Sequence, residues 1–108
     1  MKLKIAPRAR REIDRIDAWW RTNRTGASDL FATEFAEAIE RIAATPEIGA
    51  RYEHSSLQMK LRRLLMPKTG QHVYYTVTAT EVVVYSVWGA HRERGPRLDD
   101  SSQRLRLL

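Results

Sequence analysis

The residue types best suited to chemistry are basic and lie in the second half of the chain, in residues 62–68 and 86–96. Imidazoles move protons and arginines hold phosphate oxygens, so together they could cleave RNA. The set that would do so is Arg63, His72, His91 and Arg92. The alternative is an arginine cluster that binds an acidic peptide or forms an ion-pair network. We favour this alternative because no carboxylate is identified as a general base.

Arginine offers a planar, permanently charged fork of donors that fits carboxylates and phosphates. Arg62 and Arg63 are neighbours in a predicted strand, where successive side chains point to opposite faces. One of them is therefore expected on the exposed side, while the other pairs with an acid or caps the helical layer. The candidate partner-binding arginines and histidine are Arg62, Arg63, His91, Arg92 and Arg94.

Trp19 completes the set of candidate binding residues. Its neighbour Trp20 continues the apolar stripe of Ala9, Ile13 and Ile16, so Trp20 is expected to pack in the core. Trp19 cannot share that face and is predicted to be at least partly exposed. An exposed tryptophan suggests a surface that binds a partner, with packing at the edge of the core as the alternative.

Composition excludes several classes of function. Hydrophobic residues make up 43% and charged residues 30% of the 108 residues, as in one globular domain. Cysteine is absent, which excludes disulfides, thiolate metal sites and a cysteine nucleophile. The three histidines have no metal-binding spacing, and no glycine-rich phosphate loop occurs, so no metal or cofactor is expected. No apolar run is long enough to span a membrane, and a cytoplasmic protein is expected.

The charge is unevenly distributed along the chain. The net charge is +6, and residues 59–97 alone carry seven basic and two acidic residues, a net of +5. A basic surface of this kind attracts nucleic acid or an acidic protein, although it can also serve solubility alone.

The elements that must position these residues follow from hydrophobic periodicity. Residues 2–5 alternate as a short half-buried strand. One helix begins at Pro7 and ends at a break in residues 23–26. A second helix begins at residue 27 or 28 and ends at residue 44, with Glu34 mostly outside. Residues 47–58 are predicted to form a surface loop.

The remainder is predicted to be β-structure, with strands at residues 60–66, 72–77 and 81–88. The order is β-α-α-β-β-β. This order predicts an α+β fold in which a helical hairpin packs on a small antiparallel sheet. Residues 1–98 form a single domain, and residues 99–108 form a C-terminal tail.

Several short motifs occur along the chain in a characteristic order. They are Pro7-Arg8-Ala9, Thr45-Pro46-Glu47-Ile48-Gly49, Arg62-Arg63, Gly70 before His72-Val73-Tyr74-Tyr75, Glu81-Val82-Val83-Val84 and His91-Arg92-Glu93-Arg94. Each is weak alone. In this order and spacing, over about residues 2–97, they resemble the ParE/RelE superfamily of type II toxin–antitoxin toxins.

The two branches of this superfamily imply different activities. RelE-like members are ribosome-dependent mRNA endonucleases that use clustered Lys and Arg with a C-terminal Tyr. Arg63 and Arg92 match that pattern, but Leu65 and His72 stand where basic residues are expected, and no Tyr follows Arg92. The resemblance therefore favours the ParE-like branch, whose members bind DNA gyrase and trap its cleaved-DNA complex without being enzymes. A RelE-like endonuclease that uses Arg63, His72, His91 and Arg92 is the alternative.

The resemblance also implies partners. ParE-like toxins are neutralised by a small ParD-like antitoxin with a DNA-binding part and an acidic, poorly ordered C-terminal segment. The basic charge of residues 59–97 suits such a segment, and Trp19 could supply an apolar anchor. A toxin–antitoxin hetero-oligomer is expected, with operator DNA bound only through the antitoxin.

Overall fold

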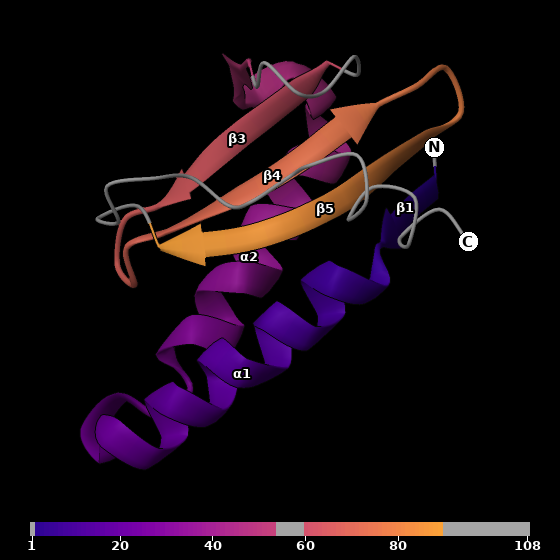
Figure 1. Cartoon of the computed structure of the whole chain (residues 1–108). Helices are drawn as coiled ribbons and strands as arrows, with labels where there is room; N and C mark the ends of the chain where they lie inside the picture. Colours follow the sequence, from indigo (N-terminus) through magenta and orange to yellow (C-terminus); the bar gives the residue numbers. More distant parts are fainter. Residues whose placement is uncertain (1, 54–59, 90–108) are drawn as a thin grey trace.

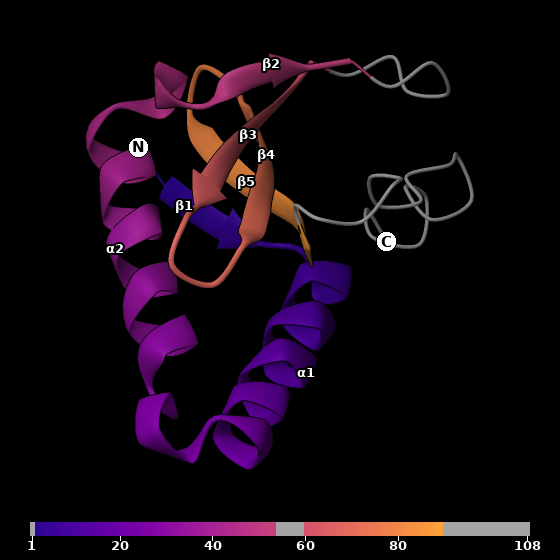
Figure 2. The same ribbon diagram turned by 90° about the vertical axis from the view of Figure 1, so that its left-hand side faces the viewer.

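The computed structural model describes residues 2–53 and 60–89, in which two helices cover one face of a five-stranded sheet (Figures 1 and 2). The predicted tail, residues 99–108, lies outside the described residues. No described helix is both long and apolar enough to cross a membrane. The helices are α1 (Pro7–Asn23) and α2 (Leu30–Ala44), with 3-10 turns at Thr25–Ala27 and Pro46–Ile48. The strands are β1 (Lys2–Ile5), β2 (Ala50–Tyr52), β3 (Leu61–Met66), β4 (Gln71–Val77) and β5 (Glu81–Gly89).

The predicted α+β fold class is confirmed, with two differences at the edges of the sheet. The strand order is β1-β5-β4-β3-β2, and β1 runs parallel to β5, so the sheet is mixed instead of antiparallel. Tight turns force neighbouring strands of the meander to be antiparallel, whereas β1 leads into the helices and its direction is free. The second difference is β2, which lies within the predicted loop 47–58 and pairs with β3. Three residues are too few for an alternation to be recognised.

The helices form where their apolar stripes were predicted. Pro7 occupies the first helical position of α1, where its missing N–H costs nothing, and Ala9 and Ile13 are buried on the inner face. In α2 the fully buried stripe residues are Phe31 and Ile42. Figure 2 shows the two helices as a V that opens toward the sheet. Both helices contact the sheet, α1 at β5 and α2 at β3.

The sheet has a different apolar cluster on each face. On the helical side, Val73 and Tyr75 of β4 belong to the main core. On the other side, Leu61 and Tyr85 form a smaller cluster with Ala6. Neither helix covers this second face, as Figure 2 shows, and we call it the open face.

Two glutamates of the helical layer are buried, each with only 6% of its surface exposed. Glu34 was predicted to lie mostly outside, and that prediction is wrong. Its carboxylate accepts hydrogen bonds from the amides of Lys68 and Thr69, at 2.7 and 2.9 Å, and from the Thr69 hydroxyl at 2.7 Å. Such charge-assisted bonds compensate for burial of the carboxylate. Glu34 thus attaches the turn between β3 and β4 to α2.

Glu12 attaches α1 to the sheet in a similar way. Its Oε1 accepts a hydrogen bond from the Ser86 hydroxyl at 2.8 Å and from the Val87 amide at 3.2 Å, while Oε2 pairs with Arg8. The pairing of β1 with β5 ends at Val84, and the carboxylate serves the β5 backbone beyond that point. Glu12 therefore stabilises the part of β5 that extends beyond its pairing with β1.

Candidate functional site

The structure places Arg62 and Arg63 on opposite faces of β3, as the alternation of strand side chains requires. Arg62 points to the helical side. Its Nη1 donates to the backbone oxygens of Gly49 and Glu47, at 2.8 and 3.1 Å. Arg62 thus holds the segment that connects α2 to β2, while Arg63 is left on the open face.

Arg63 lies within an aromatic group on the open face, which we call the open-face cluster. Its guanidinium sits 5.1 Å from the centre of the Tyr52 ring, at cation–π distance. The Tyr52 ring meets Tyr74 edge-on at 4.9 Å, and His72 meets Tyr74 edge-on at 5.8 Å. β2, β3 and β4 therefore bring together one cation, two phenols and one imidazole.

The pKa shifts of His72 and Tyr74 in this cluster favour their uncharged forms. Burial lowers the pKa of His72, and the nearby positive charge of Arg63 lowers it further. Burial raises the pKa of Tyr74, although a hydrogen bond with Arg63 acts in the opposite direction. Near neutral pH His72 is therefore mostly an uncharged imidazole and Tyr74 an uncharged phenol.

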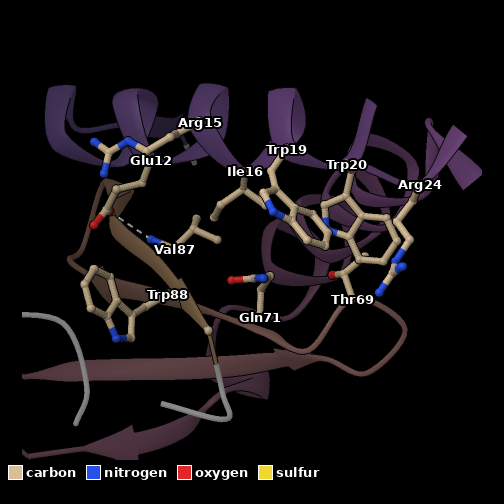
Figure 3. A pocket seen from close by; sticks show the side chains of 11 residues that line it. Glu12, Arg15, Ile16, Trp19, Trp20, Arg24, Thr69, Gln71, Val87 and Trp88 are labelled. Carbon is tan, nitrogen blue, oxygen red and sulfur yellow. Dashed lines mark hydrogen bonds between the residues drawn. The ribbon is translucent and has the colours of Figure 1, made fainter. Parts of the chain in front are cut away.

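A pocket of about 480 Å³ lies between α1, the end of β5 and the turn before β4. We call it the α1 pocket. Figure 3 shows Trp19 and Trp20 of α1, and Arg24 directly after it, projecting toward Thr69 and Gln71. Trp19 is 48% exposed, which confirms the exposure predicted from the sequence, and Trp20 packs partly against the main core.

The α1 pocket and the open face adjoin each other at the end of the sheet. Trp88 lines the pocket and is the pairing partner of His72 on the neighbouring strand. His72 in turn pairs with Leu65, an apolar residue of β3 that is 45% exposed. Aromatic and basic groups thus extend from α1 across the sheet end. This arrangement suits binding of an acidic or apolar partner more readily than proton transfer.

The structure brings some predicted site residues together and leaves others outside. Arg63 and His72 are close enough to interact electrostatically, whereas Trp19 belongs to the α1 pocket. His91, Arg92 and Arg94 lie outside the described residues. Within residues 2–53 and 60–89, no three His, Asp or Glu side chains converge as a metal site would require.

Sequence reasoning missed Arg15 and Tyr52. Arg15 lies four residues before Trp19 on the same helix, and this spacing places both on one face. That signal was available in the sequence. Tyr52 lies in the segment predicted to be a loop, so no sequence pattern indicated that it would lie beside Arg63.

Comparisons with known proteins agree with this fold. The family described as "ParE toxin of type II toxin-antitoxin system, parDE" matches residues 3–94. A solved structure described as "Chromosomal ParDE TA system from P. aeruginosa" superposes with a TM-score of 0.67 at 17% identity, covering 84% of this chain and 97% of that chain. A sequence search of curated proteins gives no match.

At 17% identity the structural likeness shows the fold alone. The α+β fold, with a helical hairpin on one face of its sheet, is thus shared with a chain of a ParDE toxin–antitoxin system. The family match extends over most of the described residues. The chain belongs to the ParE toxin family of type II toxin–antitoxin systems.

Proposed function

We propose that this chain is a toxin that inhibits DNA gyrase by binding it, and that it does not cut RNA itself. The observation that carries the proposal is the composition of the open face. Leu65 is 45% exposed there, beside a His72 whose pKa is lowered. The RelE-like endonuclease pattern has basic residues at these two positions.

The physical argument concerns the charge that develops during RNA cleavage. Its transition state places additional negative charge on phosphate oxygens, which several converging cations or donors must stabilise. On the described part of the open-face cluster, Arg63 is the cation and it is stacked against Tyr52. One guanidinium beside an apolar Leu65 is a weak clamp. Binding to a protein target makes no such demand.

The RelE-like alternative rests on the proximity of Arg63 and His72. A neutral imidazole can accept a proton, and a neighbouring guanidinium can hold a phosphate oxygen. With His91 and Arg92 these residues would form the endonuclease set. We retain this alternative because the same face carries both groups.

The proposed partner in the cell is a ParD-like antitoxin with an acidic C-terminal segment. The net charge of +5 over residues 59–97 supports this pairing, since an acidic segment would be attracted to it. The two proteins form a hetero-oligomer, and operator DNA is bound through the antitoxin. Both gyrase and the operator are in the cytoplasm, so the toxin is proposed to act there.

Two assays separate gyrase inhibition from RNA cleavage. Purified toxin is added to gyrase with relaxed plasmid and, separately, to translating ribosomes whose mRNA is mapped by primer extension. We expect lost supercoiling, accumulation of cleaved DNA, and intact mRNA. Toxin mixed beforehand with its antitoxin is the control and should leave supercoiling unchanged. Codon-linked cuts that disappear in the Arg63→Ala, His72→Gln double variant, with gyrase unaffected, would establish the endonuclease instead.

His91, Arg92 and Arg94 remain proposed contacts on sequence grounds alone. Replacing Arg92 and Arg94 by Gln should abolish toxicity and leave the melting temperature unchanged, because a contact residue acts on the partner. A matched replacement of Arg10, an exposed residue of α1, should retain toxicity. A clear fall in melting temperature would mean that Arg92 or Arg94 braces the fold instead.

A further inference from the structure

The α1 pocket has an apolar inner surface that is only partly covered by the chain. Ile16 and Trp20 are half-buried on α1, and Trp19 stands at their side with 48% of its surface exposed. The rings of Trp19 and Trp20 meet nearly at right angles, 5.7 Å apart. The two indoles thus form a corner, and the pocket of about 480 Å³ has room for a large side chain.

Two arginines line the same pocket. Arg15 and Arg24 are exposed, and none of the residues described in the structure forms an ion pair with either. The guanidinium of Arg24 lies 5.5 Å from the centre of the Trp19 ring. Stacking of this kind limits the rotamers of an arginine while leaving its N–H groups available for a carboxylate.

Among the described residues that line the pocket, Glu12 is the one acid, and its charge is already compensated. The buried Glu12 carboxylate is bound by Arg8 and the Ser86 hydroxyl. It also accepts a hydrogen bond from the Val87 amide, drawn as a dashed line in Figure 3. It therefore has little capacity to bind a further cation. Of the described lining residues, Arg15 and Arg24 supply the charge that the pocket presents to a partner, and it is positive.

We propose that the α1 pocket binds one large apolar side chain of the antitoxin's acidic segment, while Arg15 and Arg24 bind carboxylates on either side of it. This inference rests on the proposed antitoxin partnership. Arg24 follows the last helical residue, Asn23, which lies eight positions, or about 12 Å along the helix axis, beyond Arg15. An extended segment covers that distance in about four residues. A Leu, Ile or Phe with acidic residues about two positions before and after it would fit.

The adjoining open face supports this assignment. Trp88 lines the pocket and pairs with His72, so a segment seated by its anchor can continue toward Arg63. An acidic partner would thus meet the positive charge of Arg63 after those of Arg15 and Arg24. An acidic segment gains from this field in its rate of association as well as in its affinity.

The test measures binding of 15-residue peptides that tile the C-terminal half of the antitoxin encoded with this toxin. Affinities for toxin variants are determined by fluorescence anisotropy at 50 and 500 mM NaCl. We expect the tightest peptide to carry the acid–apolar–acid pattern. Trp19→Ala should weaken it about tenfold or more. Arg15→Ala and Arg24→Ala should each weaken it about three- to tenfold at 50 mM NaCl and less at 500 mM.

Arg11→Ala is the matched control, because Arg11 is an exposed arginine of α1 that does not line the pocket. Its affinity should stay within about twofold of wild type. Replacing the peptide's apolar residue by Ala should remove most of the effect of Trp19→Ala, since the two changes delete the same contact. The variants lie at exposed positions and should keep the wild-type melting temperature.

The outcomes separate this inference from the function on which it rests. If the Trp19, Arg15 and Arg24 variants bind peptide as tightly as Arg11→Ala, the pocket assignment is wrong even though the antitoxin binds. If those variants keep antitoxin affinity but lose gyrase inhibition, the pocket serves the target and the assignment is also wrong. If neither the peptides nor the whole antitoxin bind wild-type toxin, the proposed function itself fails.

Discussion

Replacing Glu34 by Gln tests whether a buried carboxylate attaches the β3–β4 turn to α2. Glu34 accepts hydrogen bonds from the Lys68 amide at 2.7 Å and from the amide and hydroxyl of Thr69 at 2.9 and 2.7 Å. Glutamine keeps one acceptor oxygen, which can still serve Thr69. Its NH2 group, however, would face the Lys68 amide, donor against donor. One charge-assisted hydrogen bond is therefore lost and the others become neutral.

The size of the effect follows from these contacts. A hydrogen bond to a charged group contributes about 1.5–3 kcal/mol, and a neutral one about 0.5–1.5 kcal/mol. The loss of one such bond and the weakening of two predicts a fall in unfolding free energy of about 2–4 kcal/mol. For a domain of this size that corresponds to a melting temperature lower by roughly 8–16 °C.

The assay is thermal unfolding followed by circular dichroism, with urea unfolding to obtain the free energy. Glu37→Gln is the matched control, because Glu37 lies exposed on the same helix, and it should change stability by about 0.5 kcal/mol or less. Thr69→Val completes a double-mutant cycle with Glu34→Gln and should show a coupling of at least about 0.5 kcal/mol. A Glu34→Gln variant with the same melting temperature as Glu37→Gln would refute the reasoning.

Three further predictions concern the junction after α2 and the open face. Tyr75→Phe removes a hydroxyl that accepts from the Gly49 amide and donates to the Pro46 oxygen, both at 2.8 Å. It should destabilise the protein by about 1–3 kcal/mol in urea unfolding; an unchanged midpoint would contradict it. Gly49→Ala would place a Cβ 2.6 Å from the Tyr75 hydroxyl oxygen, whereas Gly26→Ala meets nothing within 4 Å. We expect a loss of about 2 kcal/mol or more in the first variant and none in the second, and equal melting temperatures would show that the junction can relax. The lowered pKa of His72 means that the unfolded chain binds a proton more readily than the folded chain. Stability should therefore be fully present above the ordinary pKa of about 6.5 and fall as pH drops below it. His72→Gln should reduce this slope between pH 7 and 5.5, and an identical slope would argue against His72 as its source.

The sequence predicted the elements whose signal is periodic. The apolar stripe of α1 and the alternation along β4 are local patterns, and the structure confirms both. Alternation also predicted that Arg62 and Arg63 lie on opposite faces. Alternation could not tell which of the two arginines points toward the helices, because that depends on the packing of the whole sheet.

Other features depend on contacts between segments distant in the chain, and these were missed. Glu34 is polar and lies between apolar stripe positions, so a local pattern assigns it to solvent. Its burial requires the donors of Thr69, which are 35 positions away in the chain. The same reason explains why the α1 pocket was not predicted, because helix, turn and strand end each contribute a wall.

The pairing of the first strand with the last described one has a consequence for synthesis of the toxin. β1 begins at Lys2, yet its pairing partner in β5 begins at Glu81, and β5 lies between β1 and β4 in the sheet. Of the described strands, the one synthesised last is therefore internal to the sheet. A chain released from the ribosome before residue 81 lacks β5. Strands β1 and β4 then have no strand between them to pair with, and the core cannot close. Contacts of such sequence separation also form slowly. Truncated products of the gene should thus be unfolded and open to proteolysis, so that toxicity requires translation through β5.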